Sequence, residues 1–239
     1  MTRHLKRLNA PRALRIHRKE STWTIRASPG PHPLDRSIPL GLIVRDYLNL
    51  CDTLRETKRV LSQGEILIDG RVRKSHKFPV GLMDVVSIPK LDKNYRVLFD
   101  HRGRLVLVPI PEAESTWKLC RIENKTILKG NKTQLNLHDG NNKLVDEDKY
   151  HTGDVLKISF DGKEIQEVYP REPGVISLII GGNHIGELAT IQGFEIIRSS
   201  KPNIARMKGV KEFITLQKYV FPVGRDKPVI TVPEVKFNE

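Results

Sequence analysis

The side chains of this chain that are best suited to chemistry are basic ones crowded between positions 55 and 77. Lysine and arginine bind phosphate oxygens, and such contacts supply the sequence-independent part of nucleic-acid binding. Arg55, Lys58 and Arg59 are spaced three and four residues apart, so they would share one face of a helix. The cluster predicts a surface that binds RNA phosphates. Its members are Arg55, Lys58, Arg59, Arg71, Arg73, Lys74, His76 and Lys77.

Two helices are expected to position the first part of this cluster. Apolar residues recur with helical spacing over 40–48, after Pro39, which suits the first turn of a helix. A second helix should begin at Thr53, because Thr53 and Glu56 have the spacing of a capping box. It should end near Gly64, and its basic face would be left for a partner.

A hairpin is expected to position the rest of the cluster. Strands at 65–68 and 71–74 flank Asp69-Gly70, which is a strong two-residue hairpin signal. A short apolar strand follows at 84–88. The order helix, basic helix, hairpin, strand predicts a small α+β module.

The first thirty residues form a second basic segment. They carry eight basic residues and one acid, Glu20, and so supply +7 of the formal net charge of +13. Apolar residues and Trp23 are interleaved with the charges, which favours an extension that becomes ordered on RNA. A solvated basic tail is the alternative, and Trp23 either stacks on a base or packs against the body. The basic members are Arg3, Lys6, Arg7, Arg12, Arg15, Arg18, Lys19 and Arg26.

Charge and composition bound the class of partner and the compartment. A net charge of +13 and a pI near 9.8 favour a polyanion, and the absence of a long basic amphipathic helix favours nucleic acid over a membrane. Cys51 and Cys120 are too few for a zinc site or a disulfide framework. No apolar run approaches the roughly 18 residues of a membrane span. We expect a soluble cytoplasmic protein.

The segment from 93 to 173 alternates apolar and polar residues in short runs broken by turns such as Asp139-Gly140 and Asp161-Gly162. This pattern predicts a central β domain. The expected strands lie at 96–99, 105–108, 118–122, 134–137, 154–160 and 164–168.

The last segment, 174–239, begins with two predicted strands joined by a glycine-rich turn at Gly181-Gly182. It lacks the spacing of a phosphate-binding loop. The pattern resembles the KOW motif, a hairpin of a small SH3-like β-barrel, although a plain hairpin is the alternative. Gly186 would let the backbone turn tightly or approach RNA. The residues 221–231 suggest an extended C-terminal arm.

Several motifs together resemble one family. The module resembles the S-four RNA-binding fold through Thr53-x-x-Glu56 and Gly64-x-Ile66-x-Ile68-Asp69-Gly70. The N-terminus is similar to that of the archaeal and eukaryotic small-subunit ribosomal protein S-four-e. The matching residues there are His4-Leu5-Lys6-Arg7-Leu8-x-Ala10-Pro11 and Trp23-x-x-Arg26-x-Ser28-Pro29-Gly30-Pro31-His32. The resemblance implies a structural constituent of the small ribosomal subunit, whose partners are small-subunit ribosomal RNA and neighbouring ribosomal proteins.

The predicted fold is therefore α+β and multidomain. It comprises a basic N-terminal extension with a proline-rich connector at 1–36, an S-four-like module at 37–92 and a central β domain at 93–173. A KOW-type barrel with a C-terminal arm completes it at 174–239. Neither a cofactor nor a metal nor a small-molecule substrate is expected.

An enzyme is the main alternative, because RNA pseudouridine synthases also carry S-four-like modules. Their nucleophilic aspartate lies in a Gly-Arg-Leu-Asp pattern, whereas Val106 follows Gly103-Arg104-Leu105 here. The histidines show no metal-ligand spacing. A free-standing RNA-binding or RNA-modifying factor, or a KOW-containing elongation factor, is the competing class, and we expect the chain not to be an enzyme.

Overall fold

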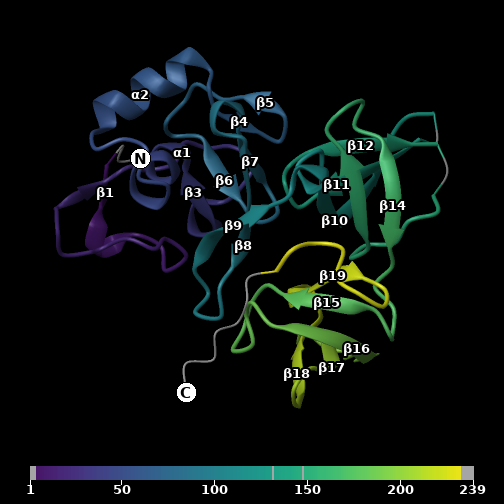
Figure 1. Ribbon diagram of the computed structural model, residues 1–239. Helices are drawn as coiled ribbons and strands as arrows, with labels where there is room; N and C mark the ends of the chain where they lie inside the picture. The colour runs from purple at the N-terminus through teal and green to yellow at the C-terminus, as the bar shows by residue number, and fades with distance from the viewer. Residues whose placement is uncertain (1–3, 131, 147, 233–239) are drawn as a thin grey trace. The chain divides into compact units, whose positions relative to one another are not determined.

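A computed structural model describes residues 4–130, 132–146 and 148–232, whose contacts divide the chain into two compact units (Figure 1). Unit 1 comprises the described residues up to Leu98 together with Arg104–Lys118. Unit 2 comprises Phe99–Gly103 and the described residues from Leu119 onward. Antiparallel strands dominate both units, and the longest helix lies in unit 1.

The helix predicted after Pro39 is present, but it widens along its length. It begins as α1 (Leu40–Leu42) and continues as the π-helix η3 (Ile43–Tyr47), in which the Leu48 N–H donates to the Ile43 carbonyl over 3.0 Å. Leu40, Ile43 and Val44 are fully buried, as their spacing predicts. Asn49 ends the segment with a φ of 51°.

The second helix, α2 (Leu54–Gln63), confirms both predicted ends. The Glu56 N–H donates to the Thr53 hydroxyl over 3.2 Å, and the Thr53 N–H donates to the Glu56 carboxylate over 3.3 Å. The backbone N–H groups of Thr53 and Asp52 both donate to the Glu56 carboxylate and lower its pKa. Gly64 closes the helix with a φ of 78°. Helix α2 packs on α1 and η3 through its buried face, which leaves its basic face outward.

A five-stranded sheet carries the predicted hairpin. Asp69 and Gly70 both have positive φ, 52° and 72°, as a tight primed turn requires. The two hairpins β4–β5 and β8–β9 lie in one sheet, so the division drawn from the sequence at residue 93 falls inside it. Val97 and Leu98 are buried, which explains why β8 joins the module. In the order β5-β4-β7-β8-β9, the strands are Arg71–Val72, Leu67–Ile68, Val85–Ile88, Lys93–Phe99 and Leu105–Ile110.

Smaller elements surround this sheet. The short strands pair as β1 with β2 and β3 with β6. They are β1 (Leu5–Lys6), β2 (Trp23–Thr24), β3 (Ser37–Pro39) and β6 (Pro79–Gly81); the 3-10 helices are η1 (Arg7–Asn9), η2 (Leu34–Arg36), η4 (Pro89–Leu91) and η5 (Glu112–Glu114).

The N-terminal extension packs against the module. Ala13, Leu14 and Ile25 are buried, and the Leu105 N–H donates to the Ala13 carbonyl over 2.8 Å. The interleaved apolar residues supply the physical reason, because they remove apolar surface from water inside the protein itself.

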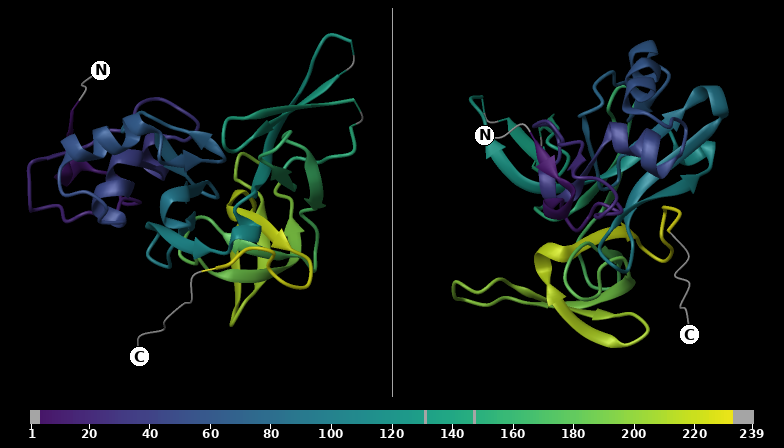
Figure 2. Two further views of the ribbon diagram at one scale, coloured as in Figure 1. Left: turned by 45° about the horizontal axis from the view of Figure 1, so that its top comes forward. Right: turned by 90° about the vertical axis from the view of Figure 1, so that its left-hand side faces the viewer.

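Unit 2 contains two five-stranded antiparallel sheets, and Figures 1 and 2 show the last five strands in green to yellow. Each sheet has its own core, with Leu135 and Leu156 in one and Ile179 and Met207 in the other. In the first sheet the strands are β12 (Asn142–Val145), β11 (Thr133–Leu137), β10 (Trp117–Ile127), β13 (Val155–Ser159) and β14 (Ile165–Tyr169). In the second they are β18 (Glu212–Leu216), β17 (Ile204–Lys208), β16 (Leu188–Glu195), β15 (Ile176–Ile179) and β19 (Val220–Gly224), with the 3-10 helix η6 (Gln217–Tyr219) before β19.

Gly186 in the β15–β16 connection approaches protein backbone. Its φ is 84°, and a Cβ there would lie 2.8 Å from the carbonyl carbon of Asp100. The sequence predicted that Gly186 allows a tight turn or a close approach to RNA. In the structure, the backbone of Asp100 occupies the space beside Gly186.

No helix within the described ranges is long and apolar enough to cross a membrane. Cys51 and Cys120 are both buried.

A buried ionic cluster ties distant parts of unit 1 together. Lys118 Nζ donates to Asp69 Oδ2 over 2.6 Å and to Asp84 Oδ1 over 3.0 Å. The other Asp84 oxygen lies 2.9 Å from His32 Nε2 and accepts from the Gly81 N–H over 2.9 Å. The cluster thus joins the proline-rich connector, the hairpin turn and the end of unit 1.

The two carboxylates of this cluster are not equivalent. Burial alone would raise the pKa of Asp84, but Lys118 and His32 outweigh it and lower that pKa. Burial and the neighbouring charge of Asp84 raise the pKa of Asp69 to about 7. Asp84 is therefore the ionised partner of Lys118, and Asp69 is the carboxylate that takes up a proton first.

We predict opposite effects of pH on the variants Asp84→Asn and Asp69→Asn. Asp84→Asn should lower the free energy of unfolding by about 3–5 kcal/mol at neutral pH, because it removes one partner of a buried ion pair. This cost should shrink as the pH falls below about 4, where the carboxylate protonates in the unfolded chain. Urea unfolding at a series of pH values measures the free energy of unfolding of the wild type and of both variants.

Asp69→Asn should cost less than Asp84→Asn at neutral pH. The folded pKa of Asp69 lies above its unfolded value, so ionisation of Asp69 weakens the wild-type protein as the pH rises from about 4 to about 7. The amide side chain that replaces this carboxylate does not ionise, and the variant should gain stability relative to wild type over that window. Equal costs for both variants at every pH would contradict this assignment of charges.

Candidate nucleic-acid interface

The basic face of α2 and the loop that follows β5 lie close together. Burial, Lys58 and Lys77, in that order, lower the pKa of His76, so both ammonium groups act on the same imidazole. The Gly41 N–H donates to the His76 carbonyl over 2.8 Å, and the Leu40 N–H donates to the Phe78 carbonyl over 2.9 Å. These bonds fix the loop to the start of α1. We call this surface the helix–loop patch: Arg55, Lys58, Arg59, Lys74, His76 and Lys77.

The cations of the helix–loop patch have no acidic partners among the described residues. The side chains of Arg55, Lys58, Arg59, Lys74 and Lys77 are exposed and form no ion pair within the described parts of the chain. Basic residues elsewhere on the surface do pair, as Lys90 with Glu65 and Lys125 with Asp148. The patch therefore carries uncompensated positive charge, which attracts a polyanion.

The hairpin contributes two arginines to the basic surface, one exposed and one stacked on an aromatic ring. Arg71 on β5 is exposed. Arg73 is half-buried, and its guanidinium carbon lies 4.5 Å from the centre of the Phe78 ring. Stacking on an aromatic ring restrains the guanidinium orientation, so Arg73 belongs both to the hairpin's packing and to its basic surface.

Two predicted contacts of the extension are directed inward instead. The Arg7 side chain is only 9% exposed, and its guanidinium lies 3.2 Å from Glu20 and 3.8 Å from Asp46. Arg18 donates to backbone carbonyls, among them that of Ala10 over 2.7 Å. The sequence predicted phosphate contacts for both, but each stabilises the folded extension, because Asp46 and the carbonyls reach them only after folding.

The other residues predicted in the extension occupy varied positions. Lys6, Arg12, Arg15 and Lys19 are exposed, and Arg26 is half-buried. Trp23 is 56% exposed and its ring centre lies 5.6 Å from that of His4, so a face of the indole is accessible to a base. Arg3 lies outside the described residues.

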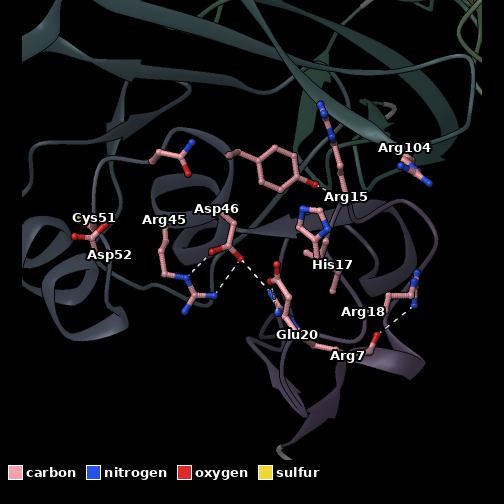
Figure 3. Close-up of a pocket in the computed structure, with 13 residues that line it drawn as sticks. Arg7, Arg15, His17, Arg18, Glu20, Arg45, Asp46, Cys51, Asp52 and Arg104 are labelled. Atoms are coloured by element: carbon pink, nitrogen blue, oxygen red, sulfur yellow. Dashed lines mark hydrogen bonds and ion pairs between the residues drawn. The ribbon is translucent and has the colours of Figure 1, made fainter.

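Sequence reasoning missed two arginines that line the same cleft as Arg15. Arg45 follows the first turn of the helix and Arg104 lies just before β9, yet both line one cleft with the extension (Figure 3). In the sequence, Arg104 stands out only within the Gly103-Arg104-Leu105 run. No sequence signal joins it to Arg15, because the two are brought together by the packing of the extension on the sheet.

No group of three or more histidine, cysteine, aspartate or glutamate side chains is arranged to hold a metal ion within the described residues. The geometry instead offers separated guanidinium and ammonium groups on rigid elements. The fold and these surfaces define a basic, multidomain protein of the RNA-binding class.

Comparison with known proteins identifies the family. The family described as Ribosomal family S4e matches residues 91–165, and the domain described as RS4NT (NUC023) matches residues 1–35. The small ribosomal subunit protein eS4 of Methanothermobacter thermautotrophicus is 51% identical over 97% of this chain and 96% of that protein. The protein of the same name from Archaeoglobus fulgidus is 48% identical over 95% of this chain and 97% of that protein.

A solved structure agrees with the sequence comparison. The crystal structure of the 30S ribosomal protein S4e from Thermoplasma acidophilum superposes with a TM-score of 0.70 and 34% identity, covering 80% of this chain and 96% of that chain. The chain belongs to the S4e family of small-subunit ribosomal proteins. Membership confirms the resemblance found in the sequence and the prediction of a structural protein, and it does not favour a free-standing factor.

We predict that Lys58→Ala raises the pKa of His76 toward its ordinary value of about 6.5, because it removes one of the charges that lower it. NMR titration of the imidazole measures this pKa. Bound RNA phosphates should raise it further in the wild-type protein. Lys93→Ala, an exposed lysine on β8, is the control and should leave the pKa of His76 unchanged. An unaltered pKa in Lys58→Ala would show that the patch is not assembled.

Proposed function

We propose that this chain is a structural constituent of the small ribosomal subunit in the cytoplasm, where it binds and stabilises folded small-subunit ribosomal RNA. The uncompensated charge of the helix–loop patch is the observation that carries the proposal. Folded RNA presents phosphates at near-regular spacing, and the patch holds its cations on a capped helix and a loop fixed by backbone hydrogen bonds. The proposed phosphate contacts are Arg55, Lys58, Arg59, Arg71, Lys74 and Lys77.

The exposed part of the extension adds a second contact area in this proposal. Lys6, Arg12 and Lys19 would bind phosphates, and Trp23 would stack on a base. Neighbouring ribosomal proteins are the proposed protein partners, and no helix among the described residues could cross a membrane.

We infer that the last five strands form the KOW-type barrel that the glycine-rich turn suggested. The strand order β18-β17-β16-β15-β19 and the 3-10 helix before β19 support this assignment. The domain division then becomes an extension, a module that runs to Lys118, a central β domain and this C-terminal domain.

The triple variant Arg55→Ala, Lys58→Ala, Arg59→Ala should weaken binding to small-subunit ribosomal RNA across all sequences. Each lost phosphate contact should reduce the slope of log affinity against log salt by about 1, so the slope should fall by about 3. Filter binding or fluorescence anisotropy between roughly 50 and 200 mM salt measures the affinity and its salt slope. The affinity of the wild-type protein should fall about a thousandfold or more over that range.

The matched control replaces three exposed lysines outside the patch, Lys93, Lys208 and Lys211, with alanine. It removes the same charge and should leave a steeper salt slope than the patch variant. Equal slopes for wild type and the patch variant would overturn the phosphate-binding role of α2.

A further inference from the structure

A cleft of about 960 Å³ opens within unit 1 between the extension and the end of the first helix (Figure 3). We call it the arginine cleft. Its volume suits a nucleotide-sized ligand. The helical side is contributed by η3, where the π-helical turn carries Arg45, Asp46 and Tyr47 into the lining. Such turns occur frequently at functional sites.

The cations of the arginine cleft fall into two groups. Arg7 and Arg45 are neutralised by carboxylates, since Arg45 makes two hydrogen bonds to Asp46, of 2.5 and 3.0 Å. By contrast, the side chains of Arg15 and Arg104 are exposed and form no hydrogen bond or ion pair within the described parts of the chain. These two guanidinium groups remain available to an anion.

Tyr47 shows where the available guanidinium groups lie. Its hydroxyl accepts from the Arg15 N–H over 2.8 Å. Burial raises the pKa of Tyr47 to about 12, while the nearby charges of Arg15 and Arg104 act in the opposite direction. Figure 3 shows Arg15 and Arg104 on the same side of the cleft. Guanidinium groups that share one side of a cleft provide donors for the oxygens of a phosphate.

The opposite side of the cleft has acceptors, and its one cation among the described lining residues, Arg45, is neutralised by Asp46. Figure 3 shows Asp52 and Cys51 across the cleft from Arg15 and Arg104. The Asp52 carboxylate is exposed and Asn49 lies in the same lining. A carboxylate repels a second phosphate but accepts hydrogen bonds from the N–H groups of a base. The cleft thus has a phosphate end and a base end.

We propose that the arginine cleft binds one unstacked nucleotide of the ribosomal RNA, with its phosphate on Arg15 and Arg104 and its base edge on Asp52. Guanine fits best, because its N1–H and N2 amino group present two parallel donors to one carboxylate. The proposal rests on the proposed function, since it takes ribosomal RNA as the ligand. It adds a base contact, which specifies sequence, to the phosphate contacts of the patch, which position the RNA.

The test is an NMR titration of the full chain with inorganic phosphate and with the four nucleoside monophosphates, each up to roughly 10 mM. We expect guanosine monophosphate to shift amides at 15–18 and 45–52 saturably, with affinity at least about tenfold above that of uridine monophosphate or phosphate. Arg15→Gln, Arg104→Gln together should abolish binding of every nucleotide. Asp52→Asn should remove the preference for guanosine while phosphate binding stays.

Arg36→Gln is the matched control, because Arg36 is an exposed arginine of unit 1 outside the cleft, and it should bind as wild type does. Amide shifts far from the cleft report whether each variant is folded. The proposal is overturned if guanosine monophosphate binds no tighter than phosphate, or if the double variant binds it unchanged.

The two proposals fail separately in this design. The triple variant of α2 should bind guanosine monophosphate normally while losing affinity for ribosomal RNA, because α2 does not line the cleft. If that variant bound ribosomal RNA as wild type does, only the proposed function would be contradicted. If no nucleotide bound to the cleft, only the proposal for the cleft would be contradicted.

Discussion

The ion pairs of Lys118 with Asp69 and Asp84 fix the arrangement of unit 1. The carboxylate partners of Lys118 come from the hairpin turn and from the residue just before β7, and His32 adds the proline-rich connector. Burying these charges costs desolvation energy, which only a well-formed set of hydrogen bonds offsets. The cluster therefore favours one arrangement of connector, hairpin and sheet over its alternatives.

The basic residues form two groups, those that contact acceptors within the protein and those that do not. Arg7, Arg18 and Arg45 are satisfied by carboxylates or backbone carbonyls, and they stabilise the protein itself. The side chains of the helix–loop patch lack such neighbours among the described residues. Their mutual repulsion disfavours the isolated fold slightly, and it is relieved when phosphates approach. In the proposed function, this uncompensated charge on a rigid surface is what would bind ribosomal RNA.

The patch and the arginine cleft offer different kinds of recognition. The exposed Arg55, Lys58 and Arg59 of α2 would bind any phosphate backbone of suitable geometry. The arginine cleft, with Arg15 and Arg104 at one side and Asp52 at the other, would discriminate between ligands, because a mismatched ligand would leave polar groups unsatisfied. The π-helical turn of η3 is the element that turns a plain helix end into one wall of that cleft.

The local elements and the family could be predicted from the amino-acid sequence alone. Thr53, Glu56 and Gly64 predict the ends of α2, and Asp69-Gly70 predicts the hairpin turn, because their hydrogen bonds and backbone angles involve residues close in the chain. The folded chain was needed to show that Arg7 faces Asp46, that Arg104 joins Arg15 at a cleft and that β8 and β9 extend the module's sheet. These contacts join residues that lie tens of positions apart in the chain. Tertiary packing brings them together, and no periodic pattern in the sequence predicts it.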